Sequence, residues 1–245
     1  MKKYLNPHSL PLFSVLLGVF TSFARLWLQR GGVDEKGLYI AGHPGGVLSM
    51  IAIPVFLVVL YLCTHPMAGL PHPLPARLSQ KQSGILGILS TVFLFLHGIM
   101  LFTEPLDTLG MVYAGMTFVC AVCFLWLALC RLKGIRPHYL FYVVITAYLI
   151  LHLLRQYRMW SAEPQIFAFF FQLMASVMLM LFAYQCACRR DGGSTRWYAL
   201  FHQCALFFSI AAMDNIRFYY IMALWLVTEQ FGWKPSQEAD SHETS

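Results

Sequence analysis

Charged residues are scarce in this 245-residue chain. Asp, Glu, Lys and Arg make up 11% of it, against about 25% in soluble domains. Hydrophobic residues make up 58%, and the mean hydropathy is +0.62. This composition leaves too little polar surface to face water, so a water-soluble domain is excluded. A single membrane domain, residues 1–231, is predicted, followed by a disordered acidic tail at 232–245.

Motifs that identify an enzyme are also missing. The chain contains no H-E-x-x-H zinc motif, no G-x-S-x-G nucleophile elbow and no P-loop, which excludes the enzyme classes that depend on them and favours a non-enzyme. A retinal Schiff base within a span is excluded as well, because every lysine lies in a loop or a tail. The lysines are Lys2, Lys3, Lys36, Lys81, Lys133 and Lys234. No cofactor is expected.

Seven cysteines are present, and none is predicted on the outer face of a membrane, where disulfides form. Cys120 and Cys123 have the C-x-x-C spacing of redox and metal sites. On an apolar helix, two small buried side chains explain the pair better. No metal site is therefore predicted.

Long apolar runs make up most of the sequence. Seven runs are close to the roughly 20 residues that cross about 30 Å of hydrocarbon, and loops rich in Gly and Pro separate them. They occupy 10–29, 47–64, 84–103, 108–130, 139–160, 165–188 and 197–220. The pattern predicts an all-α polytopic integral membrane bundle of about seven transmembrane helices. The last run is too long for one crossing, and we predict that 221–231 protrudes or lies on the membrane surface.

Basic residues indicate the side on which each loop lies. If the N-terminus is cytosolic, the inner loops hold most of the Lys and Arg residues, and the outer loops hold most of the acidic ones. Membrane proteins carry this excess of positive charge in cytosolic loops. We therefore predict that the N-terminus is inside and the C-terminus outside. The net charge of +6 is assigned to these loops, so the expected partner is the lipid bilayer and not nucleic acid.

Several polar residues lie inside the predicted spans, where they are costly and usually have a partner or a task. At 1.5 Å of rise per residue, five of them fall about 20–24 Å from the inner edge of the membrane. They are Arg25, His97, His152, Arg155 and Asp214. Tyr148, His152 and Arg155 have i, i+4, i+7 spacing and therefore share one helix face.

Two interpretations of this polar layer stay open. In the first, an outward-facing polar cavity binds or transports a small anion or zwitterion. The ligand-binding residues of that hypothesis are Arg25, Tyr148, His152, Arg155, Arg158 and Asp214. In the second, the layer is a structural network, in which Arg25 and Arg155 extend toward water and Asp214 pairs with Arg217.

The first outer loop, residues 31–44, has glycines on both sides of a charged turn. A hairpin here would cover the cavity as a lid, with Asp34 and Glu35 facing the arginines. A solvated connector is the alternative.

Two further functions are compatible with the sequence. His97 and His152 have similar depth and could be the axial ligands of a haem in a membrane redox protein. A structural or sensory subunit would instead act through a membrane protein partner, with the proline-rich inner loop at 71–75 and the basic inner loops as contacts.

Four short stretches resemble a known group of proteins. They are 25–28 (RLWL), 32–38 (GVDEKGL), 42–44 (GHP) and 157–165 (YRMWSAEPQ). The combination is similar to a group of polytopic membrane proteins from clostridial-type Gram-positive bacteria. The resemblance implies a bacterial plasma membrane and brings no known activity, so it implies no functional residue.

Overall fold

The computed structural model describes residues 10–32, 34, 39–40, 42–65, 80–103, 107–135, 137–160, 166–188, 195–213 and 217–229. Within these ranges the chain is all-α, as predicted, and contains no strand. The helices are α1 (Leu10–Gly31), α2 (Pro44–Thr64), α3 (Gln80–Leu101), α4 (Thr108–Leu132), α5 (Tyr139–Trp160), α6 (Ile166–Cys188), α7 (Thr195–Ala211) and α8 (Arg217–Glu229).

Helices α1 to α6 are long and apolar enough to cross a membrane. They lie where the first six spans were predicted. Their surfaces carry many large apolar side chains, for example Leu16 (61% exposed), Phe23 (67%) and Val122 (65%). Water penalises exposed apolar area of this extent, whereas hydrocarbon accommodates it. The six helices are thus consistent with a multi-pass membrane bundle.

The predicted seventh span, 197–220, is wrong, because this part of the chain forms two helices. α7 ends at Ala211, and α8 begins at Arg217. The chain turns back between them, so that a ring nitrogen of His202 lies 2.8 Å from the carbonyl oxygen of Leu226. With 17 and 13 residues, the two helices are about 25 Å and 20 Å long. They form a hairpin shorter than the other helices.

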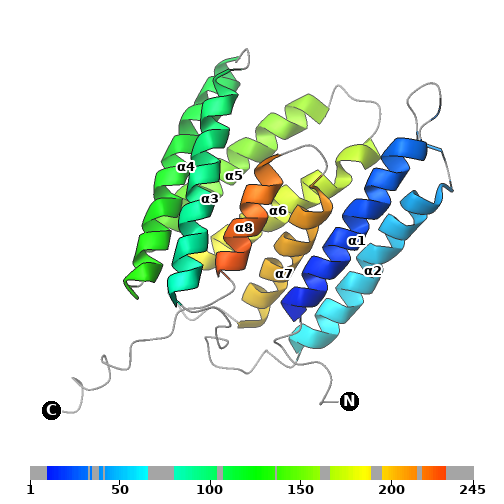
Figure 1. The fold of residues 1–245 in the computed structure, drawn as a ribbon, viewed down its shortest axis with the longest axis horizontal. Helices are drawn as coiled ribbons and strands as arrows, with labels where there is room; N and C mark the ends of the chain where they lie inside the picture. Colours follow the sequence, from blue (N-terminus) through cyan, green and yellow to red (C-terminus); the bar gives the residue numbers. More distant parts are fainter. Residues whose placement is uncertain are drawn as a thin grey trace.

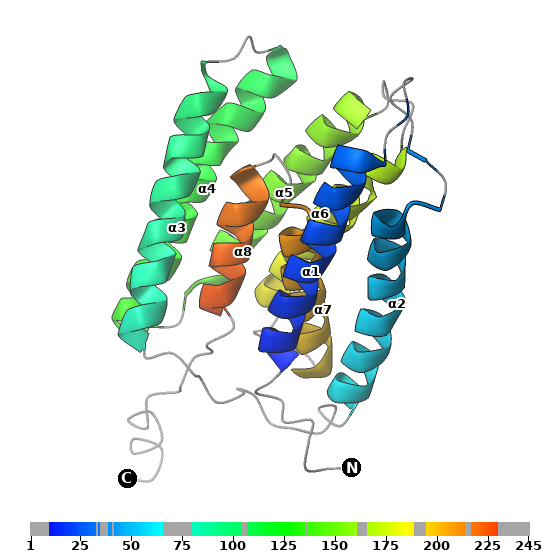
Figure 2. The same ribbon diagram turned by 45° about the vertical axis from the view of Figure 1, so that its right-hand side comes forward.

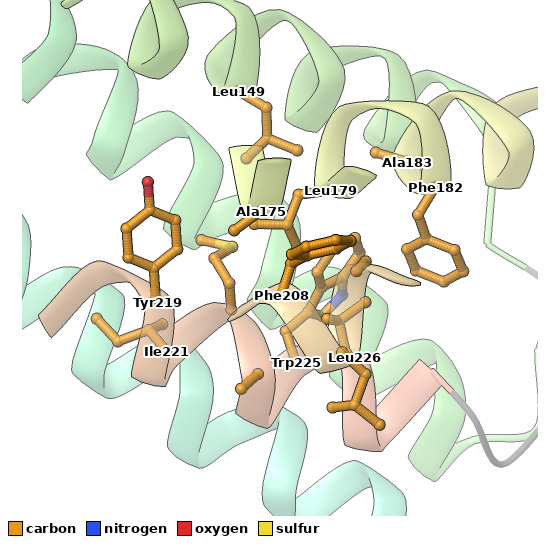
Figure 3. Close-up of a cluster of buried hydrophobic side chains, with 14 of the residues drawn as sticks. Leu149, Ala175, Leu179, Phe182, Ala183, Phe208, Tyr219, Ile221, Trp225 and Leu226 are labelled. Carbon is orange, nitrogen blue, oxygen red and sulfur yellow. The ribbon is translucent and has the colours of Figure 1, made fainter. Parts of the chain in front are cut away.

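The segment predicted to lie outside the bundle, 221–231, is also placed differently. Its described part belongs to α8 and is buried: Trp225 is 1% exposed and Leu226 is not exposed at all. Figure 3 shows Trp225 reaching from α8 toward Leu179 of α6, beside Phe208 of α7. The prediction failed because apolar composition does not distinguish a helix buried in protein from one that lies on a surface.

α8 lies at the centre of the bundle (Figures 1 and 2). Helices α2, α1 and α7 follow one another on one side of it, α3 and α4 lie on the other side, and α5 and α6 pack behind. Side chains and backbone carbonyls of α8 contact five neighbours, α3 to α7, which explains why most of its residues are buried.

The direction of α7 determines at which end of the bundle α8 ends. α1 and α7 run parallel, because Ser14 bonds Gln203, and farther along both helices Arg25 bonds Ala211. α8 returns antiparallel to α7 and therefore ends where α1 begins.

We call this end of the bundle the Leu10 end and the opposite one the Gly31 end. The sequence predicts that the N-terminus and the C-terminus lie on opposite sides of the membrane. In the described helices, however, α1 begins and α8 ends at the same end of the bundle, because the α7–α8 hairpin brings the chain back. Which end faces the cytosol stays a prediction.

Candidate functional site

The first turn of α8 lies against side chains of α3 and α5. The imidazole of His152 stacks on the ring of Phe218 with centroids 3.7 Å apart, and the ring of His97 lies 6.3 Å from the same ring. His152 is 1% exposed. Two polar residues predicted to share one layer are therefore brought together. The N–H groups of the first turn of α8 have no partner within their helix.

A chain of hydroxyl groups holds His152 from one side. The Tyr113 hydroxyl lies 2.8 Å from Nδ1 of His152 and 3.1 Å from the Tyr148 hydroxyl, which in turn lies 3.3 Å from the Thr117 hydroxyl. Each hydroxyl donates one proton, so the protons of this chain can all point toward His152 or all point away from it. Nδ1 accepts a hydrogen bond in the first arrangement and donates one in the second.

The other ring nitrogen of His152, Nε2, is buried and has no hydrogen-bond partner among the described residues. The large majority of buried polar atoms in native proteins have one, so each exception needs an explanation. A neutral imidazole carries its proton on one nitrogen only. Nε2 is therefore a donor when Tyr113 donates to Nδ1, and an acceptor in the opposite arrangement. In both cases it can bind a polar atom of a ligand.

Two arginines lie near the His152 cluster. The guanidinium of Arg155, about one turn along α5, lies 4.9 Å from the centre of the Tyr113 ring. Arg217 is the first residue of α8 and is exposed. The N-terminal end of a helix adds a partial positive charge. This environment favours a ligand with a negatively charged group.

Arg25 contacts α6 and α7. Its Nη1 donates to the carbonyl oxygen of Ala211 at 2.6 Å, and its guanidinium lies 4.7 Å from the centre of the Phe171 ring. Carbonyl groups in the last turn of a helix lack helical partners. Arg25, only 3% exposed, satisfies one of them at the point where α7 ends inside the bundle. Arg25 therefore caps the end of α7.

Two other predicted site residues, Arg158 and Asp34, are exposed. Arg158 pairs with Asp107 at 2.6 Å on the surface, with side chains 68% and 53% exposed. Asp34 is exposed in the connection after α1. Asp214 and Glu35 lie outside the described residues, so the structure does not place the predicted counter-charge or complete the predicted lid.

A cavity of about 480 Å³ lies at the Gly31 end, between α1 and α2. Leu28 and Met50 line it from the helices, and Tyr39, Ile40 and His43 line it from their connection. The segment predicted as a lid thus borders a space between α1 and α2, while the His152 cluster is formed by α3, α4, α5 and α8.

The described residues contain no group of three His, Cys, Asp or Glu side chains that could hold a metal ion. Cys120 and Cys123 are buried free thiols. His97 and His152 both pack on Phe218, and their ligation of a haem stays a prediction.

A second buried polar cluster lies at the Leu10 end of α8, and the sequence analysis missed it. Arg131 of α4 forms an ion pair with Glu229, the last residue of α8, and their side chains are 7% and 4% exposed. The carboxylate also accepts hydrogen bonds from the Tyr142 hydroxyl at 3.3 Å and from Nε1 of Trp225 at 3.2 Å. We call this group the Arg131–Glu229 cluster.

The same cluster joins the last turn of α8 to its neighbours. Arg131 donates to the Thr228 hydroxyl at 2.5 Å, and Ser83 of α3 donates to the Thr228 carbonyl at 2.9 Å. Tyr198 of α7 donates to the carbonyl of Glu229 at 3.1 Å. Helices α3, α4, α5 and α7 therefore all bind the end of α8.

One signal in the sequence indicated this arrangement. Asp214-Asn215 is a pair of turn-forming residues in the middle of an apolar run that is too long for one span. A turn at that point predicts a reversal of the chain, which brings Glu229 to the end of the bundle that holds Arg131.

No family model, no curated protein and no solved structure matches this chain. The resemblance to clostridial-type membrane proteins therefore contributes no role for any residue.

Proposed function

We propose that the protein binds a small anionic or zwitterionic solute at the start of α8 and transports it across a membrane. The observation that supports the proposal most directly is Nε2 of His152. This buried atom lacks a hydrogen-bond partner within the part of the chain that the structure describes, and its ring stacks on the side chain of Phe218, in the first turn of a helix that begins inside the bundle.

Interrupted helices have a known use in membrane transport. Secondary transporters form solute sites where helices are broken within the membrane, and the N-terminal ends of the half-helices point at anionic groups of the solute. α8 begins in such a position, because Phe218 lies level with His152, about 12 Å before the Gly31 end of α5. The helix dipole and Arg155 both attract an anionic group there.

The hydroxyl chain behind His152 suits a ligand of either hydrogen-bonding type. When Tyr113 donates to Nδ1, the proton of His152 is on Nε2, which donates to a ligand oxygen. When the chain is reversed, Nε2 accepts from a ligand N–H, such as the amino group of a zwitterion. The surrounding positive charge favours the first arrangement.

The variant His152→Asn tests the proposal. The Asn side chain can replace Nδ1 as the partner of Tyr113, but it places no polar atom at the position of Nε2. The melting temperature of the purified protein is measured with acetate, phosphate, sulfate and glycine in turn, at constant ionic strength. We expect at least one of these solutes to raise the melting temperature of the wild type and to have no such effect on His152→Asn.

His202→Asn is the matched control. His202 is also buried, 2% exposed, but both of its ring nitrogens have partners, the carbonyl of Leu226 at 2.8 Å and the amide of Gln203 at 3.2 Å. This variant should lose stability and keep the solute-induced shift. The proposal is wrong if no solute shifts the wild type, or if both variants lose the shift equally. Uptake of the stabilising solute into proteoliposomes then distinguishes transport from binding alone.

A further inference from the structure

We infer that the Arg131–Glu229 cluster is a latch that closes the Leu10 end of the solute pathway and opens when α8 moves. The inference rests on the proposed function, to which it adds the gate. It concerns the end of α8 opposite to His152, so the two ideas depend on different residues.

α8 is the element suited to such a movement. It has 13 residues, it is separated from α7 by a break in the helix, and it lies at the centre of the bundle (Figure 2). A displacement of its Leu10 end separates it from α3, α4, α5 and α7 at once. Rigid-body displacement of one element against its neighbours is a common form of gating.

The two ends of α8 are held in different ways. At the Leu10 end, an ion pair and hydrogen bonds connect α8 to four helices. Near the Gly31 end, the Tyr219 hydroxyl lies 3.0 Å from the Ser176 hydroxyl and 3.0 Å from the carbonyl oxygen of Gln172, both on α6. Release of Glu229 would therefore leave α8 attached to α6, with Tyr219 as its pivot.

The energetics of a buried ion pair suit a latch. Desolvation of two charges offsets most of their attraction, so such a pair adds little net stability and is better suited to a switch. When the Leu10 end opens, water solvates both Arg131 and Glu229 and replaces the interaction that is lost. The open state is then accessible, whereas removal of one partner leaves the other charge uncompensated in the closed state.

A cysteine at position 83 reports on the closed state. Ser83 is 2% exposed and bonds the carbonyl of Thr228. In a protein whose native cysteines are replaced, Ser83→Cys should react slowly with a charged maleimide. Addition of Glu229→Gln should raise the rate about tenfold or more, as expected when an interaction worth more than about 1.4 kcal/mol is lost.

Asp107→Asn is the control for this experiment. It removes the charge of an exposed ion pair, and Asn keeps the side-chain oxygen that accepts from the Gly110 N–H at the start of α4. The reaction rate at position 83 should not change. Equal rates in folded Glu229→Gln and in Asp107→Asn would overturn the latch.

The double variant Arg131→Met/Glu229→Met separates a latch from a purely structural pair. Apolar replacement of both partners is often neutral for stability, so this variant should fold and protect position 83. In the Ser83→Cys reporter with Arg131 and Glu229 intact, the anion with the largest thermal shift (acetate, phosphate or sulfate) should slow labelling by favouring the closed state. The double variant should lose that effect.

The outcomes distinguish this inference from the proposed function. If the double variant keeps the effect of the anion on labelling, the pair is structural and the latch is wrong. If no anion shifts the melting temperature, the proposed function fails. The rate of maleimide labelling at position 83 in Glu229→Gln still decides whether the cluster closes the Leu10 end. If Glu229→Gln does not fold, the effect of the anion on labelling in the double variant decides whether the latch exists.

Discussion

The two ends of α8 are both buried and polar, and they differ in how well their polar groups are matched. At the Leu10 end, Glu229 pairs with Arg131 and also accepts from Tyr142 and Trp225, so its charge and its hydrogen-bonding capacity are satisfied. At the Gly31 end, one ring nitrogen of His152 has no hydrogen-bond partner in the described part of the chain, and the guanidinium of Arg155 lies over the ring of Tyr113, which contacts His152. A matched cluster holds helices together, whereas an unmatched one retains the capacity to bind a ligand.

The mismatch at His152 has a cost. A buried polar atom without a hydrogen bond loses about 1–3 kcal/mol of hydration that nothing replaces. Natural proteins accept local violations of this kind mainly at functional sites and compensate for them elsewhere. The comparison within α8 therefore places the expected ligand at the Gly31 end and the matched polar contacts at the Leu10 end.

Removal of one partner at the matched end should have the largest effect on stability. Glu229→Ala leaves Arg131 buried without a counter-charge, and we expect the free energy of unfolding to fall by about 3–5 kcal/mol. Reversible unfolding of the purified protein in mixed micelles measures it. Asp107→Asn, at the exposed pair with Arg158, should cost less than about 1 kcal/mol. Similar losses in the two variants would contradict the difference between the buried and the exposed pair.

Removal of the cap at the break between α7 and α8 should have an intermediate effect. Arg25→Met leaves the carbonyl of Ala211 buried without its donor, which should cost about 1–3 kcal/mol. Arg30→Met, at the exposed end of α1, should change stability by no more than about 0.5 kcal/mol. The same unfolding assay compares them. A loss for Arg25→Met as small as that for Arg30→Met would mean that another group satisfies the end of α7.

Loss of one hydroxyl at each end should have the smallest effect and should separate binding from stability. Tyr142→Phe removes one of several donors to Glu229, and Tyr113→Phe removes the partner of Nδ1 of His152. Each should cost about 0.5–1.5 kcal/mol. Only Tyr113→Phe should also reduce the solute-induced rise in melting temperature, because the protonation of Nε2 is then no longer coupled to a hydroxyl chain. Equal reductions in both variants would remove the distinction between the two ends.

The six long helices were predictable because each satisfies its own backbone hydrogen bonds and is apolar over its full length, which are local properties of the sequence. The hairpin was not predicted. Its residues 197–220 are as apolar as a membrane span, but α7 and α8 are buried among other helices and do not need the length of a membrane. Asp214-Asn215 was the local sign of the turn.

The candidate site was predicted in part. The i, i+4, i+7 spacing of Tyr148, His152 and Arg155 placed them on one helix face. In the structure, Tyr148 and His152 form hydrogen bonds with the Tyr113 hydroxyl, and the guanidinium of Arg155 lies over the Tyr113 ring. Arg25 has similar depth but faces α6 and α7. Depth along a helix follows from residue number, whereas the direction in which a side chain points across the bundle depends on how the helices pack.

The sequence by itself determined that this chain is helical, apolar and suited to a membrane, because those properties follow from composition and from the lengths of the runs. Only the tertiary structure decided that the last run folds back, that Arg131 meets Glu229, and that His152 keeps an unpartnered nitrogen at the start of α8. These features join residues as many as 98 positions apart (from 131 to 229). No local pattern specifies such pairs, because they depend on the packing of whole helices.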